Sequence, residues 1–263
     1  MGIPMDQTDA AILIDNMFRC RGYEAILTAF CNRFKYRLIP TSDQIHRLMN
    51  AFYGAALVEA KNQEGILDKN LHFLALDNLY RTFAASLYSN ITPTPETYSY
   101  LIAAGVFGGT EEGIRRSMIT AQEMISLSVP FTHTAASAMC MVYLKAGSID
   151  MAVKVLNHSS MEEPLPLHTR LQEINLLISR NSPNEFLQES KNYLKELKES
   201  QVTQKENKST NVSERDLAIK EAIENAFPPS YEIIGKGLEK FKNDLSIESV
   251  KELEMNLKDI YNR

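Results

Sequence analysis

Residues 93–127 read PTPETYSYLIAAGVFGGTEEGIRRSMITAQEMISL, and this stretch indicates the fold most directly. A proline in the first turn and Thr94 as a cap predict a helix whose regular part covers residues 98–107. The Gly-Gly-Thr sequence at 108–110 predicts the end of that helix and the start of another over residues 114–127. The stretch is therefore expected to form two helices joined by a tight turn.

The same pattern extends over the rest of the chain. Apolar residues recur at intervals of three or four in nearly every long segment, and few segments alternate at every second residue, so the chain is expected to be all-α. The expected helices form five pairs and a final group of three. They cover residues 10–18, 25–34, 45–52, 71–87, 98–107, 114–127, 135–144, 149–156, 171–178, 186–197, 213–227, 231–241 and 247–261.

A polar segment divides the predicted helices. Residues 199–212 contain almost nothing to bury, which is typical of a flexible linker. The sequence therefore predicts a helical-repeat domain over residues 1–200, a flexible linker over 201–212 and a short helical C-terminal module over 213–263.

The helical pairs show internal similarity. Gly109 and Gly147 lie 38 residues apart and have the same position relative to the preceding helix. The segment Pro40–Met49 aligns without a gap with Pro93–Ile102, 53 residues further on, which places an insertion in the unit between them. Stacked helical pairs bury a core only against their neighbours, so imperfect repeats of this kind predict an α-solenoid.

These repeats resemble those of pentatricopeptide repeat proteins, and in particular the divergent fungal mitochondrial members of that family. Ile91–Ile102 resembles the family's linker and first-helix opening, with its Pro, Thr-Tyr-polar step and Leu-Ile. Leu144–Ala152 resembles the turn between the two helices, and Cys20–Ala25 is a fainter copy. The resemblance covers about residues 7–200 and is closest over residues 91–157.

The resemblance implies a right-handed α-solenoid that binds single-stranded RNA, mitochondrial mRNA or rRNA, without catalysis. Its expected role is in mitochondrial gene expression: transcript stability, processing, translation or the mitoribosome. The family reads a base with the polar residue after the first-helix Tyr and with the last residue of the repeat. Carried over by position, these residues are Ser99, Ser137 and His46 in first helices, and Thr41, Thr94 and Thr132 at repeat ends. Serine and threonine at helix starts are equally typical of ordinary caps.

A cluster of positive charge lies between positions 19 and 37. Five basic residues stand here against one acid, Glu24, and they alternate with aromatic rings; the basic residues are Arg19, Arg21, Arg33, Lys35 and Arg37. Such a patch can neutralise phosphates and stack bases, so Arg33, Lys35 and Arg37 are candidate RNA-binding residues. The alternative is a solvated helix end near the negative end of its dipole.

Composition limits the other functions. The 263-residue chain has a net charge of −5, which argues against a generally basic nucleic-acid-binding particle. This charge favours the alternative function, a helical-repeat scaffold that binds protein, such as an assembly factor or a peripheral subunit of a mitochondrial complex including the mitoribosome. Three widely spaced cysteines and five scattered histidines match no metal-ligand or catalytic spacing, so no cofactor, metal or enzymatic activity is expected. No apolar stretch is long enough for a membrane span, and no DNA partner is expected. The resemblance implies the mitochondrial matrix; because no transit peptide is recognisable, a fragment or a mature form is expected.

Overall fold

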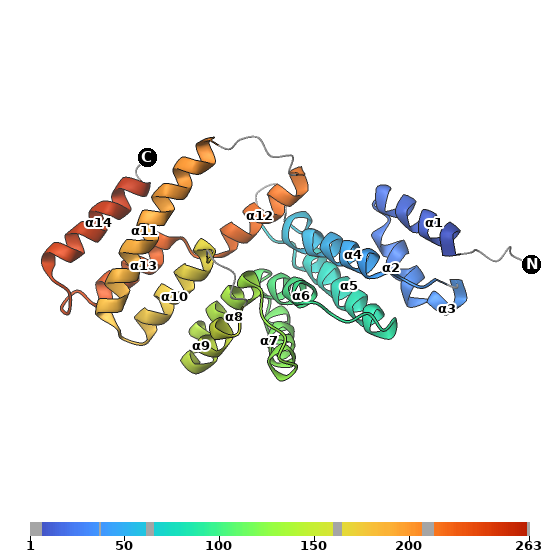
Figure 1. The fold of residues 1–263 in the computed structure, drawn as a ribbon, viewed down its shortest axis with the longest axis horizontal. Coiled ribbons are helices and arrows are strands. Elements are labelled where there is room, and N and C mark those ends of the chain that lie inside the picture. Colours follow the sequence, from blue (N-terminus) through green and yellow to red (C-terminus); the bar gives the residue numbers. More distant parts are fainter. Residues whose placement is uncertain (1–6, 37, 62–65, 160–164, 207–212, 262–263) are drawn as a thin grey trace, which may run out of the picture. The chain divides into compact units, whose positions relative to one another are not determined.

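The chain is built from helices and their connections. A computed structural model describes residues 7–36, 38–61, 66–159, 165–206 and 213–261 (Figure 1). Within these residues there are two isolated β-bridges and no strand, which confirms the all-α prediction. No helix in this described part is long and apolar enough to cross a membrane. The chain forms two compact units, residues 1–130 and 131–263.

The first unit contains three helical pairs and two short additional elements. In chain order its elements are α1 (Gln7–Arg19), α2 (Tyr23–Cys31), α3 (Arg33–Tyr36), α4 (Ser42–Gly54), the π-helix η1 (Ala55–Glu59), α5 (Lys69–Tyr88), α6 (Pro95–Phe107) and α7 (Glu111–Ser126). The helices start where capping residues predict: the Asp68 side chain accepts hydrogen bonds from two backbone N–H groups at the start of α5.

Packing within the first unit runs from one pair to the next. α1 contacts α2, α4 contacts α5 and α6 contacts α7, whereas α2 also contacts α4 and α5, and both α4 and α5 contact α6. The buried apolar side chains come from every pair, and the largest include Ile14, Ile26, Phe30, Leu48, Met49, Leu76, Leu79 and Tyr98. No pair therefore buries its apolar face alone, as expected of stacked helical pairs.

The prediction of one helix over residues 25–34 is wrong for the last turn. α2 ends at Cys31, and the Asn32 side chain donates a hydrogen bond to the backbone oxygen of Thr28. Phe34, at the end of the predicted helix, belongs to the separate helix α3 and is 86% exposed.

The second unit also begins with helical pairs. Its helices are α8 (His133–Lys145), α9 (Ile149–Asn157), α10 (Leu167–Ser179), α11 (Pro183–Glu206), α12 (Glu214–Ala226), α13 (Ser230–Lys240) and α14 (Ile247–Tyr261). α8 contacts α9 and α10, α10 contacts α11 and α13, and α11 contacts α14.

The structure divides the C-terminal part differently from the sequence expectation. α11 continues to Glu206, so the first half of the expected linker 201–212 is helical, and residues 207–212 lie outside the described residues. α13 and α14 share one core with α10 and α11, formed by residues such as Phe186, Tyr193, Ile234 and Phe241. The helices α13 and α14 are therefore not separate from the last helical pair, because they bury their apolar faces in the core of α10 and α11.

A repeated turn ends many of the helices. In the described chain, six residues with positive φ between 55° and 72° each lie two positions after the end of a helix: Arg21, Asn90, Gly109, Ser128, Gly147 and Asn181. Their N–H groups bond back to the last helical turn, and in five of the six turns the next N–H group does so too, as Ser148 N does to Tyr143 O. Four of these turns follow at intervals of 19 residues, from Asn90 to Gly147, which supports the expected 38-residue unit.

The pair α6–α7 depends on a close backbone approach. A Cβ atom on Gly113 would lie 2.6 Å from the backbone oxygen of Gly105. The resemblance to pentatricopeptide repeats implies a small alanine near Gly113, but the close approach leaves no room even for alanine. Nearby, the Ser117 hydroxyl donates to the backbone oxygen of Ile102, which ties the two helices together at 3.0 Å.

We expect Gly113→Ala to destabilise the protein by about 1–3 kcal/mol, because the added methyl group overpacks this contact. The matched control is Gly235→Ala in α13, where a Cβ atom meets nothing within 4 Å, so the better helix propensity should raise stability by up to about 1 kcal/mol. Urea denaturation followed by far-ultraviolet circular dichroism compares the two variants. Equal gains in stability would contradict the close approach of α6 and α7.

Candidate nucleic-acid interface

The threonines expected to read bases at repeat ends act as helix caps. Thr41, Thr94 and Thr132 are the N-cap residues of α4, α6 and α8, and each side-chain oxygen accepts a hydrogen bond from the backbone N–H group three residues later. The cap contact uses one acceptor lone pair of each hydroxyl and fixes the side chain at the helix start. The capping interpretation therefore accounts for these residues.

The two serines expected in first helices are buried. Ser137 has no exposed surface and donates a hydrogen bond to the Thr169 hydroxyl of α10 at 3.1 Å. Ser99 is also buried, in a stretch of α6 where both neighbours, Tyr98 and Tyr100, contact other aromatic rings. Ser137 lies where no base can reach it, and Ser99, 9% exposed, is largely withdrawn from the surface, so these two predicted contacts are corrected.

His46 remains at the surface. Its Nε2 atom lies 3.1 Å from the hydroxyl of Tyr100, which joins α4 to α6, and the Tyr100 ring lies 5.0 Å from that of Tyr53. Burial raises the pKa of Tyr53. The exposed His46 thus belongs to a small aromatic cluster between two neighbouring first helices, a contact that the sequence analysis did not identify.

The basic residues between positions 19 and 37 do not form one patch. Arg21, after α1, lines one hollow of the first unit, whereas Arg33, on α3, lines another. Lys35 is exposed and its ammonium group lies 5.4 Å from the centre of the Tyr36 ring. Arg37 lies outside the described residues.

Arg33 stands at a cleft between α2, α3 and the second half of α5, which we call the arginine–aromatic cleft. Its volume is about 370 Å³, and it is lined by Phe30, Cys31, Arg33, Phe34, Arg81, Ala84, Ala85 and Tyr88. Phe34 is 86% exposed and Tyr88 is 76% exposed, an unusual degree of solvent exposure for two aromatic rings at one cleft.

The two guanidinium groups of this cleft are held by neutral partners. Arg33 donates to the Ser89 hydroxyl at 2.6 Å and lies 4.8 Å from the centre of the Phe34 ring. Arg81 donates to the Asn78 side-chain oxygen at 3.2 Å. No carboxylate in the described part of the chain forms an ion pair with either arginine, so both positive charges remain uncompensated.

Sequence reasoning missed half of this cleft. Arg81 and Tyr88 come from α5, far from the basic segment, and the sequence shows no charge cluster there. The sequence feature that could have indicated this half is the spacing of seven residues between Arg81 and Tyr88, which places both side chains on one face of a helix. Only the contact of α2 with α5 brings that face to Arg33 and Phe34.

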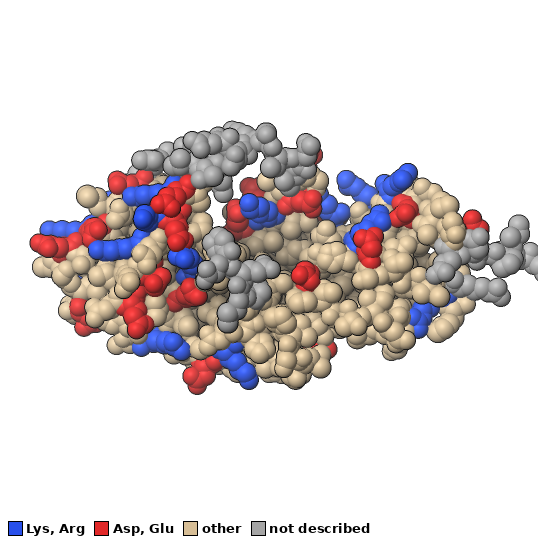
Figure 2. All heavy atoms as spheres, viewed as in Figure 1, with Lys and Arg blue, Asp and Glu red and all other residues tan. Residues whose placement is uncertain are grey.

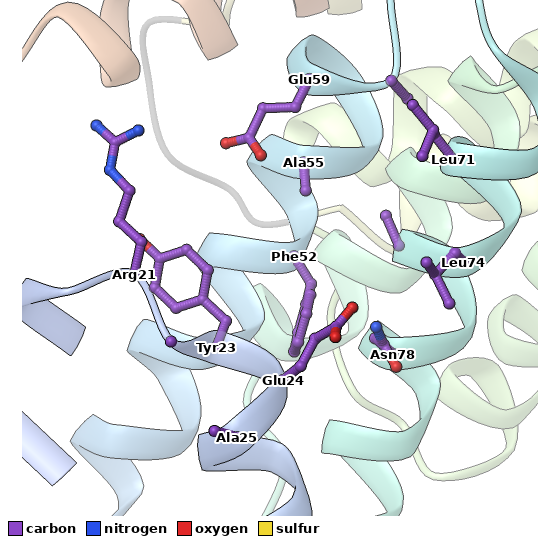
Figure 3. Close-up of a pocket in the computed structure, with 13 residues that line it drawn as sticks. Arg21, Tyr23, Glu24, Ala25, Phe52, Ala55, Glu59, Leu71, Leu74 and Asn78 are labelled. Carbon is purple, nitrogen blue, oxygen red and sulfur yellow. The ribbon is translucent and has the colours of Figure 1, made fainter. Parts of the chain in front are cut away.

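A second hollow lies at the other end of α2, and we call it the alanine-floored groove. Its volume is about 640 Å³, and Figure 3 shows it between the start of α2 and the first half of α5. It is lined by Arg21, Gly22, Tyr23, Glu24, Ala25, Phe52, Ala55, Glu59, Ala60, Leu71, Leu74, Ala75 and Asn78. Apolar surface predominates, so its chemistry differs from that of the arginine–aromatic cleft.

Charge is distributed differently elsewhere. On the face shown in Figure 2, side chains of both signs lie next to one another over α11, α13 and α14, whereas few charges lie over α6. The ion pair between Lys191 of α11 and Glu252 of α14 is one example. This mixed surface offers no continuous positive track for a nucleic acid.

One histidine of the second unit, His168, has a structural role. The His168 ring stacks on Phe227, with centroids 5.1 Å apart, and joins α10 to the residue after α12. Burial, together with nearby His133, lowers the pKa of His168 to about 4, so this ring is neutral at neutral pH. In the described part of the chain, no group of three or more histidine, cysteine or acidic residues is arranged to hold a metal ion.

Comparison with known proteins gives no assignment: no protein-family model and no curated protein matches the chain. The site must therefore be interpreted from its own chemistry.

The three thiols provide a direct test of this geometry. Cys20 and Cys31 are exposed, whereas Cys140 is buried and its pKa is raised to about 12 by that burial and by nearby Glu173. We expect two thiols to react rapidly with Ellman's reagent in the native protein and the third only after unfolding. In a Cys20→Ser variant one fast thiol, Cys31, should remain. Equal reaction rates for all three thiols would contradict the structure of both units.

Proposed function

We propose that this chain is a non-catalytic, single-stranded RNA-binding protein of the pentatricopeptide-repeat type. The fold supports this proposal through its stacked helical pairs, and through the helix-ending turns that recur every 19 residues from Asn90 to Gly147. The proposed arrangement of the pairs is a right-handed α-solenoid. The proposed setting, mitochondrial gene expression, follows from the sequence resemblance.

The observation that carries the proposal is the arginine–aromatic cleft. Two guanidinium groups without a carboxylate partner, Arg33 and Arg81, lie beside two exposed rings, Phe34 and Tyr88. Guanidinium groups bind phosphate oxygens, and exposed aromatic rings stack on unpaired bases. A single strand presents both groups along its length, whereas the bases of a duplex are already stacked on each other.

This cleft predicts a different mode of recognition from a base code. Ser99 and Ser137 are buried and the three repeat-end threonines cap helices, so the described residues offer few hydrogen-bonding groups in register with successive bases. Stacking tolerates every base because each has an aromatic face. We therefore expect the protein to prefer single strands strongly and particular sequences weakly.

The decisive variants reverse the two charges of the cleft. We expect Arg33→Glu/Arg81→Glu to weaken binding of a labelled pool of single-stranded oligoribonucleotides about tenfold or more. The slope of log affinity against log salt should decrease in magnitude by about 1.4, at about 0.7 per phosphate contact on a single strand. Fluorescence anisotropy between about 50 and 200 mM salt measures both quantities.

Two controls separate this site from net charge. Lys145→Glu/Arg180→Glu makes the same change in net charge at exposed positions of the second unit and should leave affinity nearly unchanged. Phe34→Ala/Tyr88→Ala keeps the net charge and should cost about 1–3 kcal/mol per stacked base. Absence of binding by the unmodified chain at low salt, or equal losses in both charge-reversal variants, would refute the proposal.

A further inference from the structure

The alanine-floored groove arises from a difference in length between two packed helices. α2 has 9 residues and α5 has 20, so at 1.5 Å per residue they measure about 13 Å and about 30 Å. α2 therefore leaves part of the α5 face that it contacts uncovered. The groove lies where α2 begins, beside residues Leu71–Asn78 of α5.

The uncovered face of α5 has the pattern of a helix that packs against another helix. Leu71, Leu74, Ala75 and Asn78 follow at intervals of three and four residues, which places them on one side. Ala75 is buried, whereas Leu71 is 51% and Leu74 is 50% exposed. The two leucines therefore continue the buried stripe of α5 beyond the end of its partner.

Small side chains give the groove its depth. Its lining includes Ala25 of α2, Ala55 of η1 and Ala75 of α5, together with Ala60 and the ring of Phe52. A floor of methyl groups below a rim of leucines is a shape that receives bulky apolar side chains from outside. The volume of about 640 Å³ is in the range of ligand pockets, about 300–1,000 Å³.

The groove is built by the irregular unit of the repeat. The expected insertion between Pro40 and Pro93 corresponds to a pair in which α4 continues as the π-helix η1 and α5 extends to 20 residues. Three of the lining residues, Ala55, Glu59 and Ala60, come from η1 and its C-cap. π-Helical turns are rare and often occur at functional sites, so this local departure from α-helix is a second feature of the same groove.

The charge at the mouth of the groove is mainly negative. Glu24 and Glu59 both line it, and no cation in the described part of the chain pairs with the Glu24 carboxylate. Figure 3 shows the Glu24 carboxylate turned toward Asn78, whereas the Arg21 side chain extends away from the groove. A ligand with an apolar face and a nearby positive charge is therefore complementary, and a nucleic acid is not.

We propose that this groove binds an amphipathic helix of about two turns from a partner protein, because the α5 residues beside it, Leu71–Asn78, span about 12 Å. The partner helix presents leucine-sized residues at intervals of three or four to the alanine floor, and a lysine or arginine that pairs with Glu24. This is the helix-in-groove mode of peptide recognition. The site is separate from the arginine–aromatic cleft, which lies at the opposite end of α2.

The test uses the full chain and a phage-displayed library of helical peptides. Selected peptides should carry two large apolar residues three or four positions apart, followed or preceded by a basic residue. A synthetic copy should bind the unmodified chain and lose about tenfold or more in affinity to Ala25→Trp, which fills the groove from an exposed position. Leu74→Arg should have the same effect, and Glu24→Lys should favour acidic peptides instead.

The controls distinguish peptide binding in this groove from non-specific hydrophobic binding and from binding at the RNA site. Leu217→Arg changes an equally exposed leucine of α12 and should leave peptide affinity unchanged. Circular dichroism verifies the fold of each variant, and Ala25→Trp and Glu24→Lys alter only exposed residues of α2. Ala25→Trp should also bind single-stranded RNA as the unmodified chain does. No enriched peptide class, peptides that bind Ala25→Trp unchanged, or loss of RNA binding in that variant would overturn the proposal.

Discussion

The contact of the short helix α2 with the long helix α5 determines both hollows of the first unit. Leu27 and Phe30 of α2 are buried, and Phe30 lines the same hollow as Ala84 and Ala85 of α5. Because α2 has 9 residues and α5 has 20, α5 extends beyond it at both ends. One end forms the apolar alanine-floored groove, and the other forms the arginine–aromatic cleft.

Local chemistry explains how a chain with a net charge of −5 can offer a site for a polyanion. The charges of α11, α13 and α14 largely cancel one another at the surface, as the pair Lys191–Glu252 illustrates. Arg33 and Arg81 are held instead by a serine hydroxyl and an asparagine oxygen, which leave their charges uncompensated. Phosphate binding depends on such local, unpaired cations more than on the total charge.

Helix positions could be predicted well from the sequence because they follow from local signals. Caps such as Thr94 and left-handed turn residues such as Gly109 act over a few residues, and the structure places helix ends where they indicate. The prediction was wrong for the last turn of the expected helix 25–34, because the Asn32 side chain donates a hydrogen bond to the backbone oxygen of Thr28. Such a side-chain bond competes with the bonds that would continue the helix, and apolar spacing does not reveal it. The helical continuation of α11 to Glu206 shows that a polar sequence with good helix formers need not be a linker.

The site could be predicted only in part. Arg33 was found because it lies in a basic segment, but its partners Arg81 and Tyr88 lie about fifty residues away and meet it only through tertiary packing. Ser99 and Ser137 were misplaced because α6 and α8 are buried on nearly all sides, where a small hydroxyl with a partner fits as well as an alanine. The position of a residue within the repeat therefore did not predict whether its side chain is exposed to a ligand.

The most direct measurement is ultraviolet cross-linking of the full chain to single-stranded oligoribonucleotides, with the linked peptides identified by mass spectrometry. Rings stacked on bases form such links readily, so the account predicts cross-links at Phe34 and Tyr88, which disappear when Arg33 and Arg81 are both replaced by glutamate. Cross-links confined to residues 131–263, or to the aromatic cluster around His46 and Tyr100, would contradict the assignment of the arginine–aromatic cleft as the RNA site.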